Sequence, residues 1–110
     1  NAVTAISGSG PAYVFYLAEV LAGSGEALGL DPSTAIRLAY QTIAGAGAML
    51  DLADANAGDL RRNVTSPGGT TEAALEVLMA ETGLGDLMRR ATSAAVQRAR
   101  ALAIPDKTEN

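Results

Sequence analysis

Apolar residues recur along the first half of the chain at the three- and four-residue spacing of helices. The first helical segment has Pro11 in its first turn, where the missing N–H is not needed, and Gly29 marks its end. The second begins at Asp31, which can cap it, with Pro32 at the first helical position. The predicted apolar lines of the two helices are Val14, Leu17, Leu21 and Leu28, then Ile36, Ala39, Ile43, Ala46 or Gly47, and Leu50.

The second half of the chain continues the same periodicity in three pieces. A short helix is predicted over 56–63, with Asn56 as its cap and Asp59 in the first turn, where its charge suits the helix dipole. Another is predicted over 71–81, and Gly83 and Gly85 separate it from a last helix. That last helix carries Leu84, Leu87 or Met88, Ala91, Ala94 or Ala95, and Leu102. Because no segment alternates like a strand, the sequence predicts an all-α fold of about five helices.

Small residues dominate the apolar content of these helices. The chain of 110 residues is 48% apolar, but it holds 23 Ala and 12 Gly against one Phe and no Trp. Small side chains bury little area, so one copy of a domain this size has a marginal core, and we expect a homo-oligomer. Gly45 and Gly47 each cost about 1 kcal/mol relative to Ala inside a helix. They therefore favour close packing of another backbone over the alternative, a flexible kink.

Composition excludes several classes of chemistry. The chain has no His and no Cys, which rules out a His- or Cys-ligated metal, a Ser-His-Asp triad, a thiol nucleophile and a disulfide. No metal site is expected. The net charge of −4 and the scattered basic residues argue against a nucleic-acid partner. The apolar run 12–22 contains Glu19 and is too short to span a bilayer, so no membrane partner is expected.

The two ends of the chain add two further expectations. The chain begins Asn1-Ala2-Val3, without an initiator Met, which favours a domain fragment whose chemistry is shared with a missing piece. No signal peptide pattern is present, and the lack of Cys is compatible with the cytoplasmic location that we expect. Pro105 and the polar residues after it are predicted to fray.

The stretch Val64–Ala74, VTSPGGTTEAA, interrupts the helical pattern. As a plain helix start, Pro67 fixes its φ, Gly68 and Gly69 allow positive φ, and Thr70 or Thr71 caps the next helix. As a binding site, the two glycines expose backbone N–H groups at the point where a helix directs its own free N–H groups. No Lys or Arg stands within the turn, so it suits a single carboxylate better than a polyphosphate.

A second turn rich in Gly and Ser, Ser7–Pro11 (SGSGP), precedes the first helix. By itself it indicates no more than an N-terminal turn. Two separate turns that combine glycine with hydroxyl residues and lead into helices are more informative than either alone.

Together these motifs carry a resemblance to a known family. "TAISGSGPAYVF" and "NVTSPGGTTEAAL" resemble the C-terminal domain of pyrroline-5-carboxylate reductase, the last enzyme of proline synthesis. The likeness runs from about Thr4 to Ala103, and the "GL…A…LA.QT..GA..ML" pattern over 29–50 agrees in spacing. It implies that residues 1–110 are a dimerisation and substrate-binding domain, and that an N-terminal Rossmann domain that binds NADPH or NADH is missing from this chain.

The resemblance also implies an assembly and a reaction. The expected assembly is an interlocked helical homodimer with a fold like that of the C-terminal domain of 6-phosphogluconate dehydrogenase. In some members of the reductase family such dimers assemble further into decamers. The expected reaction reduces 1-pyrroline-5-carboxylate to L-proline by hydride transfer to the C=N carbon at the dimer interface. The isolated domain should be inactive because it lacks the cofactor domain.

Residue roles follow by the same resemblance. The substrate carboxylate would be bound by Ser66, Gly68, Gly69, Thr70 and Thr71, chiefly through backbone N–H groups. The Thr71 hydroxyl would face the ring nitrogen as the catalytic group. Ser9 would border the substrate site, and Asn63 and Val64 would lie near the nicotinamide of the cofactor.

Two positions near the turn are left without a firm role. The short helix of the family often has Lys-Asp or a similar pair just before the turn, where this chain has Arg61-Arg62-Asn63, and we expect the extra cation to be solvated rather than in contact with substrate. Asp54 matches a position that is usually acidic in the family.

Two alternatives stay open at this point. One is a helical dimerisation module without a ligand, whose turns are only helix caps. The other is a related reductase of the same architecture that acts on a different imine or keto acid.

Overall fold

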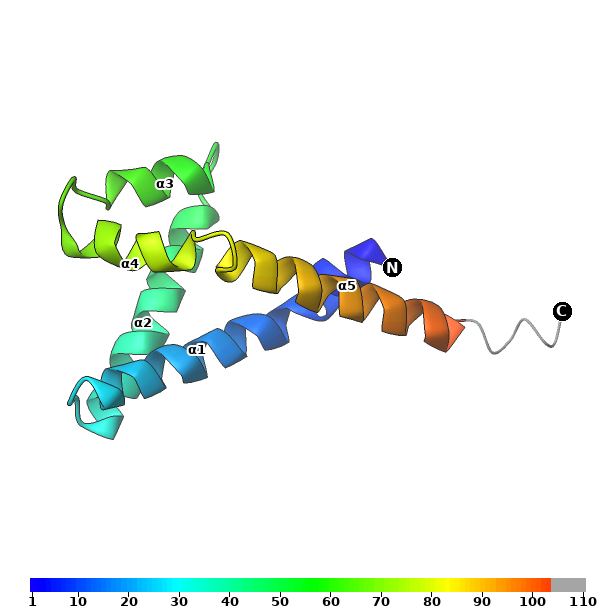
Figure 1. Cartoon of the computed structure of the whole chain (residues 1–110), viewed down its shortest axis with the longest axis horizontal. Coiled ribbons are helices and arrows are strands. Elements are labelled where there is room, and N and C mark those ends of the chain that lie inside the picture. The colour runs from blue at the N-terminus through cyan, green and yellow to red at the C-terminus, as the bar shows by residue number, and fades with distance from the viewer. Residues whose placement is uncertain (104–110) are drawn as a thin grey trace, which may run out of the picture. The chain divides into compact units, whose positions relative to one another are not determined.

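The computed structural model describes residues 1–103 and is helical throughout (Figure 1). A π-helical segment precedes five α-helices, and no strand occurs within residues 1–103. The elements are η1 (Thr4–Gly8), α1 (Gly10–Ala27), α2 (Pro32–Leu50), α3 (Ala57–Asn63), α4 (Thr70–Leu78) and α5 (Leu84–Ala103). The predicted all-α fold of five helices is confirmed, while the fraying predicted for Pro105 and beyond concerns residues outside the described part.

The chain divides into two compact units. The central unit is 12–64 and contains most of α1, with α2 and α3. The terminal unit combines 1–11 with the chain from Thr65 onward, and so contains η1, α4 and α5.

The connection between α1 and α2 is determined by Gly29 and Asp31. Gly29 has φ +103°, and its N–H donates to Glu26 O at 2.9 Å while Leu30 N–H donates to Gly25 O at 3.0 Å. These two bonds form a Schellman motif, so the predicted stop at Gly29 is confirmed. Asp31 then caps α2, because its carboxylate accepts hydrogen bonds from the Ser33 N–H at 3.2 Å and the Ser33 hydroxyl at 2.6 Å. Pro32 is at the first helical position, as predicted.

Within the central unit, α1 and α2 approach closely at Gly25 (Figure 1). A Cβ placed on Gly25 would lie 3.2 Å from Ala35 Cβ and 3.2 Å from Leu30 Cδ1. The buried side chains here are small ones, Ala22, Ala35 and Ala39. At Gly45 and Gly47 a Cβ would meet no atom of the described chain within 4 Å, so this chain does not supply the backbone predicted to pack there, and close packing by a second copy stays a prediction.

The short helix α3 begins as the sequence predicted. The Asn56 side chain accepts a hydrogen bond from Asp59 N–H at 2.9 Å, which makes Asn56 the N-cap. Asp59 lies in the first turn and pairs with Arg62 at 2.6 Å. Both ends of this helix thus carry the charge that its dipole favours.

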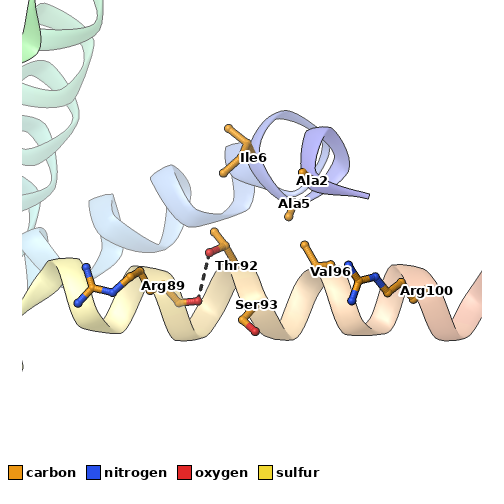
Figure 2. Close-up of a pocket in the computed structure, with 8 residues that line it drawn as sticks. All are labelled: Ala2, Ala5, Ile6, Arg89, Thr92, Ser93, Val96 and Arg100. Atoms are coloured by element: carbon orange, nitrogen blue, oxygen red, sulfur yellow. Dashed lines mark hydrogen bonds between the residues drawn. The ribbon is translucent and has the colours of Figure 1, made fainter.

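In the terminal unit, η1 packs on α5 (Figure 2). Ala5 of η1 is almost fully buried and points toward α5, where Thr92 and Val96 lie. The sequence predicted only a turn over Ser7–Pro11. Instead, Ser9 N–H donates to Thr4 O at 2.8 Å, five residues back, and the wide helical turn leads directly into α1. The π-helical hydrogen bond spans one residue more than an α-helical one, and it keeps the chain helical where the sequence predicted a turn.

Helix α4 ends earlier than predicted, at Leu78 rather than at Glu81. The cause lies at Gly83, whose backbone folds back on the last turn of α4. A Cβ at Gly83 would collide with the Leu78 carbonyl and lie 2.9 Å from Val77 O. Gly83 therefore separates α4 from α5, as predicted, but Gly85 does not, since it lies in the first turn of α5.

Large apolar side chains remain open to solvent in this chain. Among residues 1–103 no large side chain is fully buried, and those of the apolar line predicted for the first helix are 40–86% exposed. Isolated apolar residues on a surface are ordinary, but contiguous apolar faces indicate an interaction surface. No helix within residues 1–103 has the length and apolarity needed to cross a membrane.

Candidate functional site

The segment 66–69 forms a tight turn directly before α4. Gly69 N–H donates to Ser66 O at 3.0 Å, which closes a four-residue turn with Pro67 at its second position. Gly68 has φ +73°. Proline followed by a residue of positive φ is the pattern of a type II β-turn, so Pro67 and Gly68 each have the conformation that this turn requires.

The start of α4 differs from the predicted cap. Gly69 is the N-cap, with φ −90° and ψ −176°, and no side chain hydrogen-bonds to the helix start. The prediction that Thr70 or Thr71 caps α4 is therefore wrong, because both residues are already helical. Gly69 also does not use positive φ. The glycine at 69 leaves the helix start without a Cβ, and one there would lie 3.2 Å from Ser66 O.

Backbone donors remain at this helix start. The first intrahelical bond runs from Ala73 N–H to Gly69 O at 3.2 Å. The N–H groups of Thr70, Thr71 and Glu72 precede it and have no acceptor within the helix. Thr70 is exposed, and Thr71 and Glu72 are partly buried. The helix dipole favours negative charge at this position.

Glu72 takes part in the turn, and the sequence reasoning missed it. Its Oε1 accepts a hydrogen bond from Gly68 N–H at 2.9 Å. An acidic residue three positions after an N-cap is the signal for such a contact, because its side chain can reach back to the preceding backbone. Two of the predicted carboxylate donors are consequently already engaged: Gly68 N–H by Glu72, and Gly69 N–H by Ser66 O.

The remaining predicted site residues lie in different parts of the chain. Ser9, between η1 and α1, is partly buried in the terminal unit, and no hydrogen bond joins it to the turn within residues 1–103. Asn63 ends α3 and Val64 follows it as an exposed C-cap, both in the central unit. The five predicted turn residues and Ser9 thus belong to the terminal unit, whereas Asn63 and Val64 belong to the central unit.

The positions without a firm role have ordinary local explanations. Arg62 is paired with Asp59 on α3, so its charge is partly neutralised there. Asp54 has φ +60°, a left-handed conformation that Asp tolerates better than most residues. It lies in the loop between α2 and α3.

An open cleft of about 380 Å³ lies between η1 and α5 (Figure 2). It is lined by Ala2, Ala5, Ile6, Arg89, Thr92, Ser93, Val96 and Arg100. None of the predicted site residues is among them. Of the lining residues, Arg89 forms a long ion pair with Asp86 at 3.9 Å. In the described part of the chain, no group of three or more His, Cys, Asp or Glu residues could hold a metal ion.

Comparison with known proteins gives consistent results. The family described as pyrroline-5-carboxylate reductase dimerisation matches residues 1–102. A pyrroline-5-carboxylate reductase of Pseudomonas aeruginosa is 48% identical over 103 residues, which cover 94% of this chain and 37% of that protein. A pyrroline-5-carboxylate reductase of Pisum sativum is 45% identical over 93% of this chain and 37% of that protein. The chain thus spans little more than a third of the length of these relatives.

Solved structures agree with this. A pyrroline-5-carboxylate reductase of Coxiella burnetii matches with a TM-score of 0.85 and 46% identity, over 92% of this chain and 37% of that one. A Plasmodium falciparum pyrroline carboxylate reductase solved with NADP bound matches with a TM-score of 0.83 and 35% identity, over 91% of this chain and 38% of that one. With the family match over nearly the whole chain, these findings establish that the chain belongs to the pyrroline-5-carboxylate reductase dimerisation family.

Proposed function

We propose that this chain is the dimer-forming, substrate-binding part of a reductase that converts 1-pyrroline-5-carboxylate to L-proline with NADPH or NADH. One observation carries the proposal: in a member of this family, α4 begins at a glycine turn that leaves backbone N–H groups uncapped by any side chain. Such a start is costly for a helix alone and useful for binding an anion.

The substrate carboxylate is the proposed occupant of that helix start. Thr70 and Thr71 supply backbone N–H groups, and the Ser66 hydroxyl and the Thr70 hydroxyl add donors from either side of the turn. Gly68 and Gly69 shape the turn, since their own N–H groups already have acceptors. Two oxygens of one carboxylate match this small set of donors.

The Thr71 hydroxyl is the proposed catalytic group. Thr71 is the second residue of α4, its backbone N–H is one of the proposed carboxylate donors, and it is partly buried. A hydroxyl there can hold the ring nitrogen by a hydrogen bond and pass a proton to or from it. Because a protonated imine is already electrophilic, the chain needs no strong acid, and positioning supplies most of the rate gain.

The nicotinamide cofactor supplies the hydride when it is bound. The relative from Plasmodium falciparum was solved with NADP. Within this chain, Asn63 and the exposed Val64 offer an amide and an apolar surface for the edge of a nicotinamide ring. The rest of the cofactor would be bound by an N-terminal domain, as the relatives' greater length allows.

The proposed assembly is an interlocked homodimer, with the possibility of a higher oligomer such as a decamer, in the cytoplasm. The exposed apolar residues of α1 and α2 support it, because a second copy would cover them.

Removal of the Thr71 hydroxyl in the intact reductase tests the function. Thr71→Val keeps the side-chain shape and is expected to lower kcat/KM for pyrroline-5-carboxylate by about 10- to 100-fold. Thr71→Ser restores the hydroxyl and should return most of the activity. Thr92→Val is the matched control, since the Thr92 hydroxyl only donates to Met88 O at 2.9 Å and Arg89 O at 3.3 Å on α5. Normal kcat/KM in Thr71→Val would remove Thr71 from the mechanism.

A further inference from the structure

The open cleft between η1 and α5 has apolar walls along its middle (Figure 2). Ala5 and Ile6 line it from η1, and Thr92 and Val96 line it from α5. Thr92 contributes a methyl group that points toward η1, because its hydroxyl donates to carbonyl oxygens of α5 itself. Ile6 is 64% exposed, so an apolar ligand that enters the cleft removes apolar surface from water.

Both charged side chains that line the cleft are arginines, Arg89 and Arg100. Arg100 forms no ion pair within residues 1–103, and Arg89 forms only the long one to Asp86, whose carboxylate lies closer to Arg90, at 3.2 Å. The Arg100 guanidinium lies beside Val96, at the end of the apolar walls, whereas the Arg89 guanidinium points away from the cleft (Figure 2). Arg100 therefore offers an anion a cation that no carboxylate of the described chain neutralises.

The charge around the cleft favours a negative ligand. Helix α5 carries four arginines and one acidic residue, Asp86, although the net charge of the whole chain is −4. The segment η1, TAISG, carries no charged side chain, and no acidic residue lines the cleft. A locally positive surface on an acidic chain raises the concentration of anions beside it.

We propose that this cleft binds a carboxylate that bears an apolar chain, with the carboxylate on the Arg100 guanidinium and the chain between Ile6 and Val96. A guanidinium can hold both oxygens of a carboxylate through two parallel hydrogen bonds. The cleft volume of about 380 Å³ is in the range of sites for small molecules. None of the residues proposed to bind substrate lines this cleft, so the proposal does not depend on the proposed function.

Octanoate is the probe for the test, with two matched compounds beside it. Dissociation constants for the intact reductase are measured by calorimetric titration. 1-Octanol keeps the chain without the charge and is expected to bind about three- to tenfold more weakly, since a charge contact at an exposed arginine is screened by solvent. Butanoate keeps the charge and loses four CH₂ groups, which should weaken binding about tenfold in a cleft that buries them in part.

Two variants of α5 locate the binding. Arg100→Gln is expected to weaken octanoate about three- to tenfold and to leave 1-octanol unchanged. Arg98→Gln is the matched control, because Arg98 is exposed on the same helix, forms no ion pair within residues 1–103 and does not line the cleft. It should leave both constants unchanged. Ile6→Asn, at an exposed position, should weaken both compounds by removing part of the apolar wall.

The outcomes decide the proposal directly. Octanoate binding that weakens in Arg100→Gln and not in Arg98→Gln supports it. Failure of octanoate to bind the intact reductase overturns it. Octanoate that competes with pyrroline-5-carboxylate and binds Arg100→Gln as tightly as the wild type occupies another site, and this result also overturns the proposal while leaving the proposed function standing.

Discussion

Helices α2 and α3 begin in one way, and α4 begins in another. In the central unit, Asp31 and Asn56 each cap their helix with a side-chain oxygen. In the terminal unit, α4 has a glycine N-cap and no side-chain cap, although Ser66, Thr70 and Thr71 are close in sequence and could have served. All three starts face the same problem of unsatisfied N–H groups.

The difference indicates what each start is for. A side-chain cap contributes about 1 kcal/mol to a helix and satisfies one of the N–H groups that would otherwise lack an acceptor. The α4 start lacks that contribution and keeps its donors open, while Glu72 reaches past them to Gly68. A local loss of stability at a point of exposed donors is typical of a binding site.

The largest stability effect is expected at Gly68. Gly68→Ala places a side chain at φ +73°, which should lower the free energy of unfolding by about 1–2 kcal/mol. Gly85→Ala is the control: it lies in the first turn of α5, and its new Cβ meets only the flexible tip of Arg89 at 3.6 Å. Urea unfolding of both variants measures the contrast. Equal stability of the two would mean that the turn does not hold this conformation.

The capped and uncapped starts should respond differently to alanine. Asn56→Ala removes the acceptor for Asp59 N–H and should cost about 1 kcal/mol. Thr70→Ala removes no cap and should change the stability by less than about 0.5 kcal/mol. Thermal unfolding of the two variants compares the starts of α3 and α4. A full cap-sized loss for Thr70→Ala would contradict the contrast between them.

A smaller effect is expected at Glu72, whose side chain accepts a hydrogen bond from the turn before α4. Glu72→Ala leaves Gly68 N–H to water, and should cost about 0.5 kcal/mol because the bond is partly exposed. Glu76→Ala, on the exposed side of the same helix, should be neutral. Denaturant unfolding resolves the pair if the two variants are measured under identical conditions.

The smallest effect is a dependence on pH at the α2 cap. The hydrogen bonds from the Ser33 hydroxyl, from Thr34 N–H and from Ser33 N–H hold the pKa of Asp31 below its ordinary value of 3.8, against an opposing effect of desolvation. The cap's contribution is therefore present above that value and is lost as the pH falls through the lowered pKa. Melting curves from pH 5 to pH 2 should show a loss in the wild type that Asp31→Asn, a neutral cap, does not share.

Much of the fold was predictable because it depends on local chemistry. Asp31 with Pro32, Asn56 with Asp59, and Gly29 after a helix each act within a few residues, so their roles could be read from the sequence. The early end of α4 could not, because it depends on Gly83 folding back on the carbonyls of Leu78 and Val77. The π-helical turn at Thr4–Gly8 was also missed, since the glycines and serines of Ser7–Gly10 that overlap its end favour a loop by composition.

The turn before α4 was predictable in position but not in detail. The glycines and hydroxyl residues indicated a turn at 66–71, and the structure has a turn at 66–69 followed by the start of α4, while the binding roles of these residues stay a prediction. Which of the turn's N–H groups are free to bind a ligand depends on which of them already donate to acceptors within the chain. Ser66 O and Glu72 engage two of the donors, and this selection follows from the type II turn at Gly68.

The most direct test of the account is an amide NMR titration of this chain with a saturated ring carboxylate such as L-proline. The account predicts saturable shifts at Thr70, Thr71 and Glu72, at the open start of α4, and none at the first-turn amides of α2 and α3, whose caps are filled. Equal shifts at all three starts, or no shift at millimolar ligand, would contradict the claim that α4 is open in order to bind a carboxylate.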